Sequence, residues 1–424
     1  FRQALSNAGW LIGRGGKGGA SAPLAVGFYT PWDDASVASL ARHVNELDWL
    51  VPGWLSVTGP KHELIRFPDP RGRRILAGAT HRPRVLPMVQ NAIDGAWDGN
   101  GMAALLANPQ ARTALVGKLE SYLADRQVDG MTFDFEELPA SSQPDYLAFL
   151  REVRAVFAPH GWLIAVAVPV ENDDWNLPVY AGIADKLFVM AYDEHYQEGQ
   201  PGPIASQAWF AHAVTHAITG VPRSKVIIAL GSYAYDWTRG LAADAVSVED
   251  AWLSAHESGT APRYDPASGN TSFSYVEDKR RHDVWIADAA ALYNQMTTLR
   301  SAGIDSLALW RLGSEDPSVW QIFGNDNRGI QSPQAIRQIP AGTSVDIEGS
   351  GEILRVAASP VPGQRAIRVN NNRFIVDESF VRLPLPYAIE RTGNRPGLVA
   401  LTFDDGPDPT WTPKILDILK AYHV

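Results

Sequence analysis

The stretch Val128-Asp129-Gly130-Met131-Thr132-Phe133-Asp134-Phe135-Glu136-Glu137-Leu138-Pro139 decides the fold. Polar and apolar residues alternate in it, as in a strand whose successive side chains point to opposite faces. Thr132, Asp134 and Glu136 are therefore predicted to share one face, and the apolar residues between them can pack against covering helices. Glu137 has the opposite parity and should point elsewhere. Two carboxylates two residues apart lie roughly 7 Å from each other by strand rise, so each disfavours ionisation of the other. We expect one to stay protonated as an acid and the other to stay charged.

Seven further apolar runs share the character of this strand. They lie at 24–29, 49–57, 84–90, 163–170, 186–192, 226–231 and 306–310. Segments with helical periodicity lie between most of them, at 36–47, 110–125, 144–158, 206–219 and 285–302. Continuous apolar strands that alternate with helices predict a parallel sheet buried on both faces, and eight of them predict an α/β fold with a closed (β/α)8 TIM barrel. The alternative is an open doubly wound sheet, but no Gly-x-Gly-x-x-Gly follows the first strand to favour it.

The predicted strands end in polar and aromatic residues. Barrel enzymes place their chemistry at the C-terminal ends of the strands. One such residue is more often part of the core or the rim, but a full set at these ends indicates a site. The candidate substrate-binding residues are Tyr29, Trp32, Gln90, Met190, Asp193, Tyr233, Trp237 and Trp310.

The run 129–136 resembles the D-G-x-x-x-D-x-E signature of glycoside hydrolase family 18, the chitinase-like family. The resemblance extends over about 24–325. Met190-Ala191-Tyr192-Asp193 is similar to the M-x-Y-D motif on the sixth strand, and Trp310 is similar to the tryptophan that floors a sugar subsite. The insertion at about 236–284 falls where many members carry a small extra subdomain, and its 262–276 portion is typical of a hairpin.

The resemblance implies a mechanism and a substrate. The family is a substrate-assisted exception to the two-carboxylate scheme of glycosidases. By resemblance, Glu136 is the general acid, and the 2-acetamido carbonyl of the sugar attacks its own C1. Asp134 would hold the acetamido N–H, and Tyr192 would donate to the acetamido oxygen. Asp193 would bind a sugar hydroxyl, and Trp310 would stack under the ring. The implied partner is a polysaccharide or oligosaccharide that contains N-acetylglucosamine, and no cofactor is implied.

Thr132 departs from the family pattern, which usually has Asp at this position. Threonine can donate one hydrogen bond but cannot share a proton with Asp134. We therefore expect Asp134 to be a simpler and more acidic carboxylate. We also expect either lower activity or a substrate other than plain chitin.

The chain is predicted to have four parts: a flexible leader at 1–23, the barrel at 24–325, a small β module or linker at 326–393, and the incomplete start of a second β/α domain at 394–424. Residues 397–416 resemble the opening of NodB-type polysaccharide deacetylases, with a buried strand that delivers two adjacent acids. In that family the first acid is the base and the second a metal ligand, which by position are Asp404 and Asp405. The metal also needs histidines from an H-x-x-x-H that comes later in the chain, and no such motif follows Asp405 in this sequence. No metal site and no deacetylase activity are therefore predicted for this chain.

Composition narrows the function further. The chain has 424 residues with a net charge of −10, which disfavours nucleic acid as a partner. It has no cysteine, which excludes disulfides and thiolate metal sites. Its 14 tryptophans suit either core packing or stacking on sugars. We expect an extracytoplasmic location, periplasmic, cell-surface or secreted, within a larger protein that has fused downstream domains; whether that protein is membrane-anchored stays open.

Three functions remain open at this stage. The first is a hydrolase or transglycosylase of β-linked N-acetylglucosamine polymer. The second is a non-catalytic sugar-binding barrel that presents polymer to a fused deacetylase, and the third is a structural spacer. The combination of Asp134, Glu136 and Tyr192 favours the enzyme, because a lectin needs no acid at that position.

Overall fold

The computed structural model describes residues 22–58, 63–93, 95–325, 332–342, 344–394 and 396–424. The chain forms two compact units. The first comprises the described part of Phe1–Val345 together with Ser359–Tyr387, and the second comprises Asp346–Ala358 with Ala388–Val424. The predicted flexible leader lies almost entirely outside the described residues.

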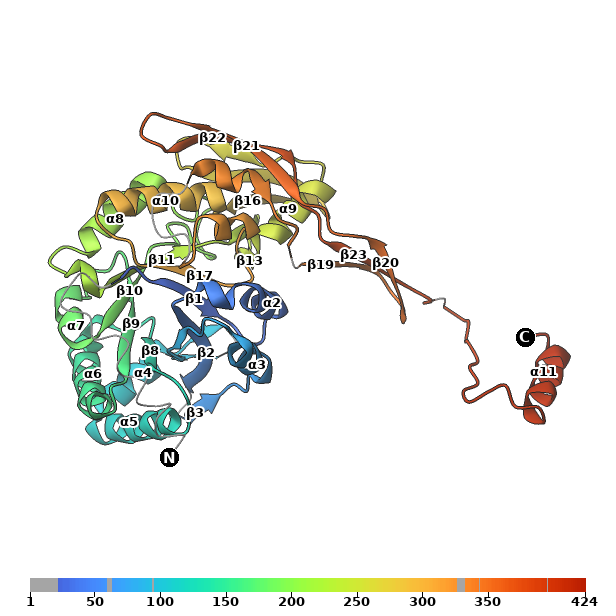
Figure 1. Cartoon of the computed structure of the whole chain (residues 1–424), viewed down its shortest axis with the longest axis horizontal. Helices are drawn as coiled ribbons and strands as arrows, with labels where there is room; N and C mark the ends of the chain where they lie inside the picture. The colour runs from blue at the N-terminus through green and yellow to red at the C-terminus, as the bar shows by residue number, and fades with distance from the viewer. Residues whose placement is uncertain (1–21, 59–62, 94, 326–331, 343, 395) are drawn as a thin grey trace. The chain divides into compact units, whose positions relative to one another are not determined.

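Eight parallel strands form a closed barrel in the first unit (Figure 1). Each strand pairs with the next along the chain, and the last pairs with the first through Ala25 and Leu307. The predicted (β/α)8 barrel is confirmed, and the open sheet is excluded by this closure. The strands are β1 (Ala25–Tyr29), β2 (Trp49–Thr58), β5 (Met88–Gln90), β8 (Gly130–Asp134), β9 (Leu163–Pro169), β10 (Lys186–Met190), β11 (Val226–Gly231) and β17 (Leu307–Trp310).

The third predicted strand is interrupted. It divides into β4 (Arg84–Val85) and β5, with Pro87 between them. Proline has no N–H to give to a neighbouring strand. Its carbonyl still accepts a hydrogen bond from the Thr132 N–H at 2.9 Å, which keeps β5 in register with β8.

Helices surround the barrel (Figure 1). They are α2 (Asp34–His43), α3 (Pro70–Gly78), α4 (Gly99–Ala107), α5 (Pro109–Ala124), α6 (Gln143–Phe157), α7 (Leu177–Ile183), α8 (Gln207–Ala217) and α10 (Ala289–Ser301). The prediction of a helix from residue 285 was wrong at its start, because Trp285 and Ile286 belong to a strand and Asp288 caps the helix. The sequence analysis missed α3, α4 and α7, which are short and contain glycine or proline.

The two faces of β8 differ as the alternation predicts. Met131, Phe133 and Phe135 pack in the layer between strands and helices, where the Phe133 ring lies edge-on to Phe149 at 5.5 Å. Thr132 and Asp134 point to the inside of the barrel and are buried. Below them, apolar side chains such as Phe28 and Phe188 fill the barrel. The interior is therefore closed at the bottom and polar at the top.

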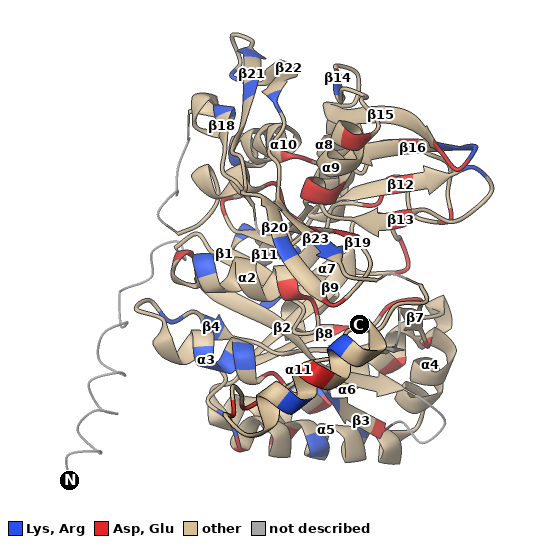
Figure 2. Ribbon diagram, turned by 90° about the vertical axis from the view of Figure 1, so that its right-hand side faces the viewer, with Lys and Arg blue, Asp and Glu red and all other residues tan. Residues whose placement is uncertain are grey.

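A five-stranded antiparallel sheet is inserted between β11 and α10. Its order is β13 (Asp244–Val246), β12 (Ala234–Thr238), β16 (Arg280–Ile286), β15 (Asn270–Glu277) and β14 (Arg263–Asp265), and α9 (Val248–Glu257) packs against it. The predicted hairpin over 262–276 is confirmed by the pairing of β14 with β15. Basic residues gather at the tip of the sheet, where Figure 2 shows a blue turn between β15 and β16.

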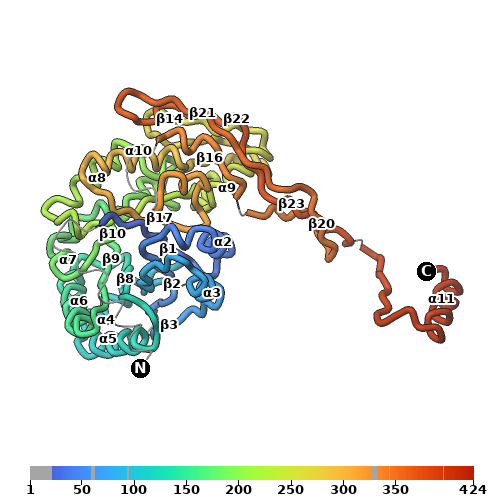
Figure 3. The backbone as a smooth tube through the Cα atoms, in the orientation of Figure 1, coloured from blue at the N-terminus to red at the C-terminus, as the bar shows by residue number. Residues whose placement is uncertain are grey.

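A second hairpin, β21 (Gly363–Val369) and β22 (Ile375–Arg382), also belongs to the first unit (Figure 3). It pairs with β18 (Gln338–Ile339) and packs on α10 and β14. The Asn294 side chain of α10 accepts from the Ile375 N–H and donates to the Ile375 carbonyl, both at 2.8 Å. Part of the predicted β module at 326–393 is therefore bonded to the barrel unit.

The second unit holds a small sheet and one helix. The sheet has the order β19 (Val345–Gly349), β23 (Tyr387–Thr392) and β20 (Ile353–Ala358), and the helix is α11 (Trp411–Tyr422). The buried strand expected over 398–403 is not present, and those residues are exposed. No described strand pairs with this segment, so it can neither satisfy its backbone in a ladder nor bury its apolar side chains. Asp404 and Asp405 that follow it are exposed as well. Among the described helices, none combines the length and the apolar character needed to cross a bilayer.

Candidate active site

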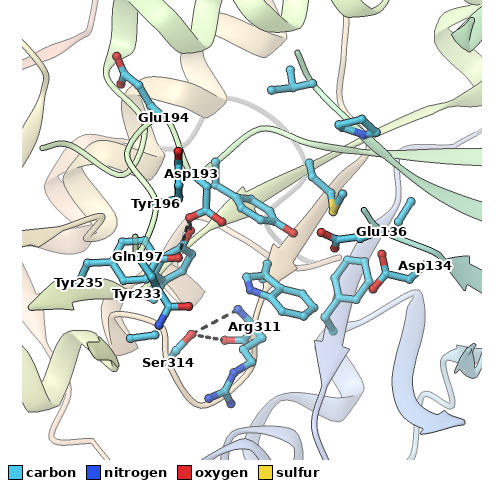
Figure 4. A pocket seen from close by; sticks show the side chains of 18 of the residues that line it. Asp134, Glu136, Asp193, Glu194, Tyr196, Gln197, Tyr233, Tyr235, Arg311 and Ser314 are labelled. Atoms are coloured by element: carbon cyan, nitrogen blue, oxygen red, sulfur yellow. Dashed lines mark hydrogen bonds between the residues drawn. The ribbon is translucent and has the colours of Figure 1, made fainter. Parts of the chain in front are cut away.

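A cavity of about 670 Å³ opens at the C-terminal ends of the barrel strands (Figure 4). Most of the residues that the sequence analysis singled out contribute to its wall. They are Gln90, Asp134, Glu136, Met190, Tyr192, Asp193, Tyr233 and Trp310. They come from β5, β8, β10, β11 and β17 or the residues just after them. Strands far apart in sequence thus meet at one end of the barrel, as a parallel closed sheet requires.

Three of the predicted substrate-binding residues lie outside the cavity wall. Tyr29 faces the helices and donates from its hydroxyl to Asp69 Oδ1 at 3.1 Å. The strand period explains this, because Phe28 is the inward-facing residue at the end of β1 and lines the cavity in its place. Trp32 is 59% exposed, and its ring lies against Phe67 at 5.3 Å. Trp237, the third of these residues, is buried in the inserted sheet.

Asp134 and Glu136 approach each other inside the cavity (Figure 4). Gln90 Nε2 donates to Asp134 Oδ2 at 2.8 Å, whereas the buried Asp134 Oδ1 has no hydrogen-bond partner among the described residues. Burial raises the pKa of Asp134 to about 6, and the hydrogen bonds from Gln90 and Glu136 oppose that rise. Burial also raises the pKa of Glu136 well above its ordinary value, and the charges of Asp134 and Asp193 raise it further. The pair therefore favours a protonated Glu136 beside an ionised Asp134.

Among the described residues, Thr132 makes no side-chain hydrogen bond to this pair. Its hydroxyl donates to the Leu86 carbonyl at 3.3 Å, and the side chain is fully buried. The expectation that Asp134 is a more acidic carboxylate was wrong. Its pKa lies above the ordinary value because the loss of hydration outweighs the hydrogen bonds from Gln90 and Glu136.

Tyr192 and Asp193 follow β10 directly. Burial and the charge of Glu136 raise the pKa of the Tyr192 hydroxyl well above its usual range, so the hydroxyl stays a neutral donor. The backbone of β11 lies close to Tyr192 at Gly231, where a Cβ would come within 2.8 Å of the Tyr192 Cβ. A glycine at this position therefore lets the two strand ends approach.

Asp193 is held by two tyrosines of the inserted sheet and its lead-in. Its backbone has φ 62, in the left-handed region that Asp tolerates better than most residues. Tyr233 and Tyr235 both donate their hydroxyls to Asp193 Oδ1, the latter at 3.0 Å. These bonds leave the other carboxylate oxygen directed at the cavity (Figure 4). Burial raises the pKa of Asp193, and the two hydroxyls oppose that rise.

Trp310 ends the last barrel strand and lines the same cavity as Asp193. Its ring is nearly parallel to that of Tyr192, with centroids 6.2 Å apart and an interplanar angle of 17°. Its other neighbour is Phe28, edge-on at 5.3 Å. A flat indole in the wall of a polar cavity is suited to stacking under a sugar ring.

Several cavity residues were not identified from the sequence. They are Trp97, Glu171, Tyr196, Gln197, Trp209 and Tyr235, among others. Trp209 lies on α8 and donates from Nε1 to Glu171 Oε2 at 2.7 Å, which orders this part of the rim. Most of these side chains come from loops, a helix and the inserted sheet rather than from the strand ends, so strand periodicity could not find them. Within the described residues of the first unit, no three carboxylate or imidazole groups come close enough together to hold a metal ion.

A (β/α)8 barrel whose fourth strand delivers two interacting carboxyls into a sugar-sized cavity is the architecture of a glycoside hydrolase. Residues 82–316 match the model of glycosyl hydrolases family 18, which covers more than half of the chain. The chain therefore belongs to family 18 of the glycosyl hydrolases. Residues 391–424 match the model of polysaccharide deacetylases, so both predicted resemblances are confirmed.

Individual relatives agree with this assignment. The chain is 29% identical over 248 residues to YdhD of Bacillus subtilis, and 25% identical over 323 residues to the uncharacterized glycosylase YvbX of the same organism. The matches cover 55% and 72% of this chain, and 59% of YdhD and 92% of YvbX. The cortical fragment-lytic enzyme of Bacillus subtilis is 26% identical over 46% of this chain and 48% of its own length. The chain thus spans about half to three fifths of two of these relatives.

Solved structures show the same fold. The spore cortex-lytic enzyme SleL of Bacillus megaterium aligns with a TM-score of 0.64 at 22% identity, over 73% of this chain and 76% of that one. A chitinase of Chromobacterium violaceum aligns with a TM-score of 0.64 at 23% identity, over 70% of this chain and 97% of that one. At the C-terminus, 39 residues are 49% identical to a peptidoglycan-N-acetylglucosamine deacetylase of Bacillus cereus, over 9% of this chain and 18% of that protein.

Proposed function

We propose that this protein hydrolyses β-linked polysaccharide containing N-acetylglucosamine, by a retaining, substrate-assisted mechanism in which Glu136 is the general acid and base. The observation that carries the proposal is the environment of Asp134 and Glu136. Asp134 is buried and Glu136 is partly buried in one cavity, and the charges around Glu136 keep it protonated while Asp134 ionises first. An acid that stays protonated near neutral pH is what protonation of a glycosidic oxygen requires.

The remaining groups suit a nucleophile that the sugar itself supplies. In the proposed first step, Glu136 gives its proton to the leaving oxygen while the acetamido carbonyl oxygen bonds to C1, which breaks the glycosidic bond and forms an oxazolinium ring. The ionised Asp134 accepts the acetamido N–H and offsets the positive charge, and Tyr192 donates to the acetamido oxygen. In the second step, Glu136 takes a proton from water, whose oxygen attacks C1 and reopens the ring. Two attacks on opposite faces retain the anomeric configuration.

Asp193 and Trp310 are proposed to bind the sugar. The free oxygen of Asp193 accepts from a hydroxyl, and the Trp310 ring stacks under the pyranose at the cleaved position. The names of the relatives, a cortical fragment-lytic enzyme and a peptidoglycan-N-acetylglucosamine deacetylase, support a cell-envelope polymer as the substrate and an extracytoplasmic place of action. The presence of a deacetylase segment in the same chain is consistent with a polymer that carries N-acetyl groups.

Turnover of a fluorogenic β-linked N-acetylglucosamine oligomer tests the proposal. Glu136→Gln should lower kcat by roughly 10²–10⁴-fold or more. Glu277→Gln is the matched control: Glu277 is exposed at the end of β15 and does not line the cavity, so the loss of its charge should leave turnover nearly unchanged. Equal turnover by wild type and Glu136→Gln would contradict the assignment of the acid. Binding of the oligomer without any cleavage by the wild type would favour the sugar-binding barrel instead.

The stereochemistry gives a second test. Proton NMR of the first products from a β-linked oligomer should show the β-anomer before mutarotation. An initial α-anomer would contradict the substrate-assisted mechanism, and products longer than the starting oligomer would indicate transglycosylation.

A further inference from the structure

Two neighbouring residues at the end of β5 hold the two carboxyl-bearing residues by different means. Because strand side chains alternate, Gln90 and Asn91 leave the backbone in opposite directions. Gln90 enters the cavity and donates from Nε2 to Asp134 Oδ2 at 2.8 Å. Asn91 turns away and reaches the backbone of Glu136.

The contact between Asn91 and Glu136 is reciprocal. Asn91 Nδ2 donates to the Glu136 carbonyl at 2.9 Å, and the Glu136 N–H donates to Asn91 Oδ1 at 2.9 Å. Glu136 lies two residues beyond the end of β8, where the strand ladder no longer fixes the chain. Asn91 has no exposed surface, and its own carbonyl accepts from the Asp98 N–H at 2.8 Å. The amide side chain therefore continues the pairing of β5 with β8 by one more step.

We propose that Gln90 and Asn91 are positioning residues that together fix the reacting geometry of the carboxyl pair, in place of an acid at position 132. Gln90 sets the orientation of the Asp134 carboxylate, and Asn91 sets the height of Glu136 above the barrel. The inference rests on the proposed function, because it concerns the residues assigned to acid and stabiliser there.

Thr132 does not orient the Asp134 carboxylate. Its hydroxyl is committed to the Leu86 carbonyl, in the break between β4 and β5 that precedes Gln90. Asp134 is therefore oriented from the neighbouring strand rather than from its own. A neutral amide donor stabilises the ionised form of Asp134 and cannot accept its proton, so Asp134 is held in one orientation throughout the reaction.

Other charged and titratable groups face the pair and could shift its titration. Asp193 and Glu137 act on Glu136, and the Tyr192 hydroxyl faces both carboxyls. Tyr146 lies behind Asp134, between β8 and α6, where burial raises the pKa of its hydroxyl. None of these groups donates a hydrogen bond to Asp134 among the described contacts. The donors to Asp134 are Gln90 and the paired Glu136, so removing the Gln90 amide changes one donor and leaves the carboxyl pair in place.

The first experiment replaces the donor alone. Gln90→Met keeps the length of the side chain but loses the N–H, and kcat should fall about 10–100-fold, as expected for a hydrogen bond to a charged group. KM should change little, and the acidic limb of the pH–rate profile should move to higher pH, because Asp134 loses the donor that favours its ionised form. Gln127→Met is the control, since Gln127 is exposed and precedes β8 at the opposite end of the strand.

A double variant tests whether the amide stands in for the missing acid. Thr132→Asp introduces a carboxyl on the inward face of β8, two residues from Asp134. If Gln90 and an acid at 132 do the same task, Gln90→Met combined with Thr132→Asp should recover part of the kcat lost in Gln90→Met, so the two effects should not add. Additive losses of kcat would contradict the inference that the Gln90 amide takes the place of an acid at position 132.

Asn91→Asp tests the second contact with almost no change of shape. The carboxylate still accepts from the Glu136 N–H but repels the Glu136 carbonyl. We expect kcat to fall at least tenfold while KM for the oligomer stays within about threefold. Thermal unfolding of all variants shows whether they fold. If Asn91→Asp does not fold, the test relies on Gln90→Met.

A measurement without turnover separates this inference from the proposed function. Carbon-13 NMR of labelled aspartate carboxyls should show Asp134 titrating at higher pH in Gln90→Met than in the wild type. An unchanged titration together with wild-type kcat overturns the positioning role. Absence of turnover in the wild type counts against the proposed function alone, because the shifted titration still supports the contact from Gln90.

Discussion

Arg365 and Asp316 form an ion pair in which neither side chain is exposed, with Arg365 Nη2 at 2.5 Å from Asp316 Oδ2. Arg365 lies on β21, and Asp316 belongs to the loop that follows the last barrel strand. Arg365 Nη1 also donates to Glu378 Oε1 on β22 at 2.8 Å. One guanidinium thus joins the second hairpin to the barrel. This contact makes the hairpin part of the hydrolase unit.

Removal of Arg365 should destabilise the first unit strongly. Arg365→Leu leaves Asp316 and Glu378 buried without their cation, and breaking a buried pair in this way costs roughly 3–5 kcal/mol. Urea denaturation followed by tryptophan fluorescence measures the change in the free energy of unfolding. Arg368→Leu, on the same strand but with its side chain 69% exposed and 3.6 Å from Asp377, should cost at most about 1 kcal/mol. Equal effects of the two substitutions would show that the hairpin is not anchored by the buried pair.

The pH–rate profile should have two limbs that belong to the carboxyl pair. The proposed mechanism needs an ionised Asp134, whose pKa is raised to about 6, so kcat/KM should fall as the pH drops through about 6. It also needs a protonated Glu136, whose pKa lies well above its usual range, so the rate should fall again on the alkaline side. The two macroscopic values describe the coupled pair rather than either residue. A profile that keeps rising below pH 5, with kcat/KM measured from about pH 4 to about pH 10, would contradict this arrangement.

The raised pKa of Glu136 predicts that this residue destabilises the fold at neutral pH. A carboxyl whose pKa is raised in the folded state favours folding only while it is protonated, so its contribution is lost as the pH rises through the folded pKa. Glu136→Gln mimics the protonated form at every pH. The Tm of this variant should therefore exceed that of the wild type at pH 8, and the difference should shrink towards about pH 3, which lies below the ordinary glutamate pKa of about 4.3, so that both states of the wild type are protonated. Differential scanning calorimetry at these pH values measures it, and a Tm difference independent of pH would refute the prediction.

Trp310 should contribute to sugar binding through its flat ring. Trp310→Ala removes the stacking surface in the cavity and should lower kcat/KM for the oligomer about tenfold or more, as the loss of one aromatic stacking contact suggests. Trp310→Phe should retain part of the effect. Trp411→Ala is the control, since Trp411 is 62% exposed in the second unit and does not line the cavity. Tryptophan fluorescence titration with the oligomer reports binding, and equal affinity of Trp310→Ala and the wild type would remove Trp310 from the subsite.

Strand periodicity allowed much of the barrel and part of its site to be predicted. The alternation around Asp134 correctly assigned the inward and outward faces of β8, because one face of each strand must be apolar to pack under helices. The period was not applied to β1, where Tyr29 was chosen as an aromatic at the strand end although Phe28 has the inward parity. Trp32 and Trp237 were chosen by nearness to strand ends, and nearness along the chain does not specify which way a loop turns.

The hairpin of β21 and β22 shows what local patterns leave out. Its short alternating strands were recognised as β structure, but their docking on α10 depends on Arg365 and Asn294 meeting partners far away in the sequence. The segment 398–403 shows the converse. Its apolar composition suits a buried strand, yet it is exposed because no described neighbour pairs with it.

The sequence by itself determined the order of strands and helices, the closure into a barrel and the placing of two acids at the end of the fourth strand, because these follow from side-chain periods of 2 and 3.6 and from burial. Only the tertiary structure decided which groups surround those acids. Gln90, Asn91 and Asp193 act on them from the ends of other strands, and Trp310 lines the same cavity. The loss of hydration that raises both pKa values exists only once the barrel has closed. Hydrogen bonds and desolvation between distant segments have no period along the chain, and so no local pattern records them.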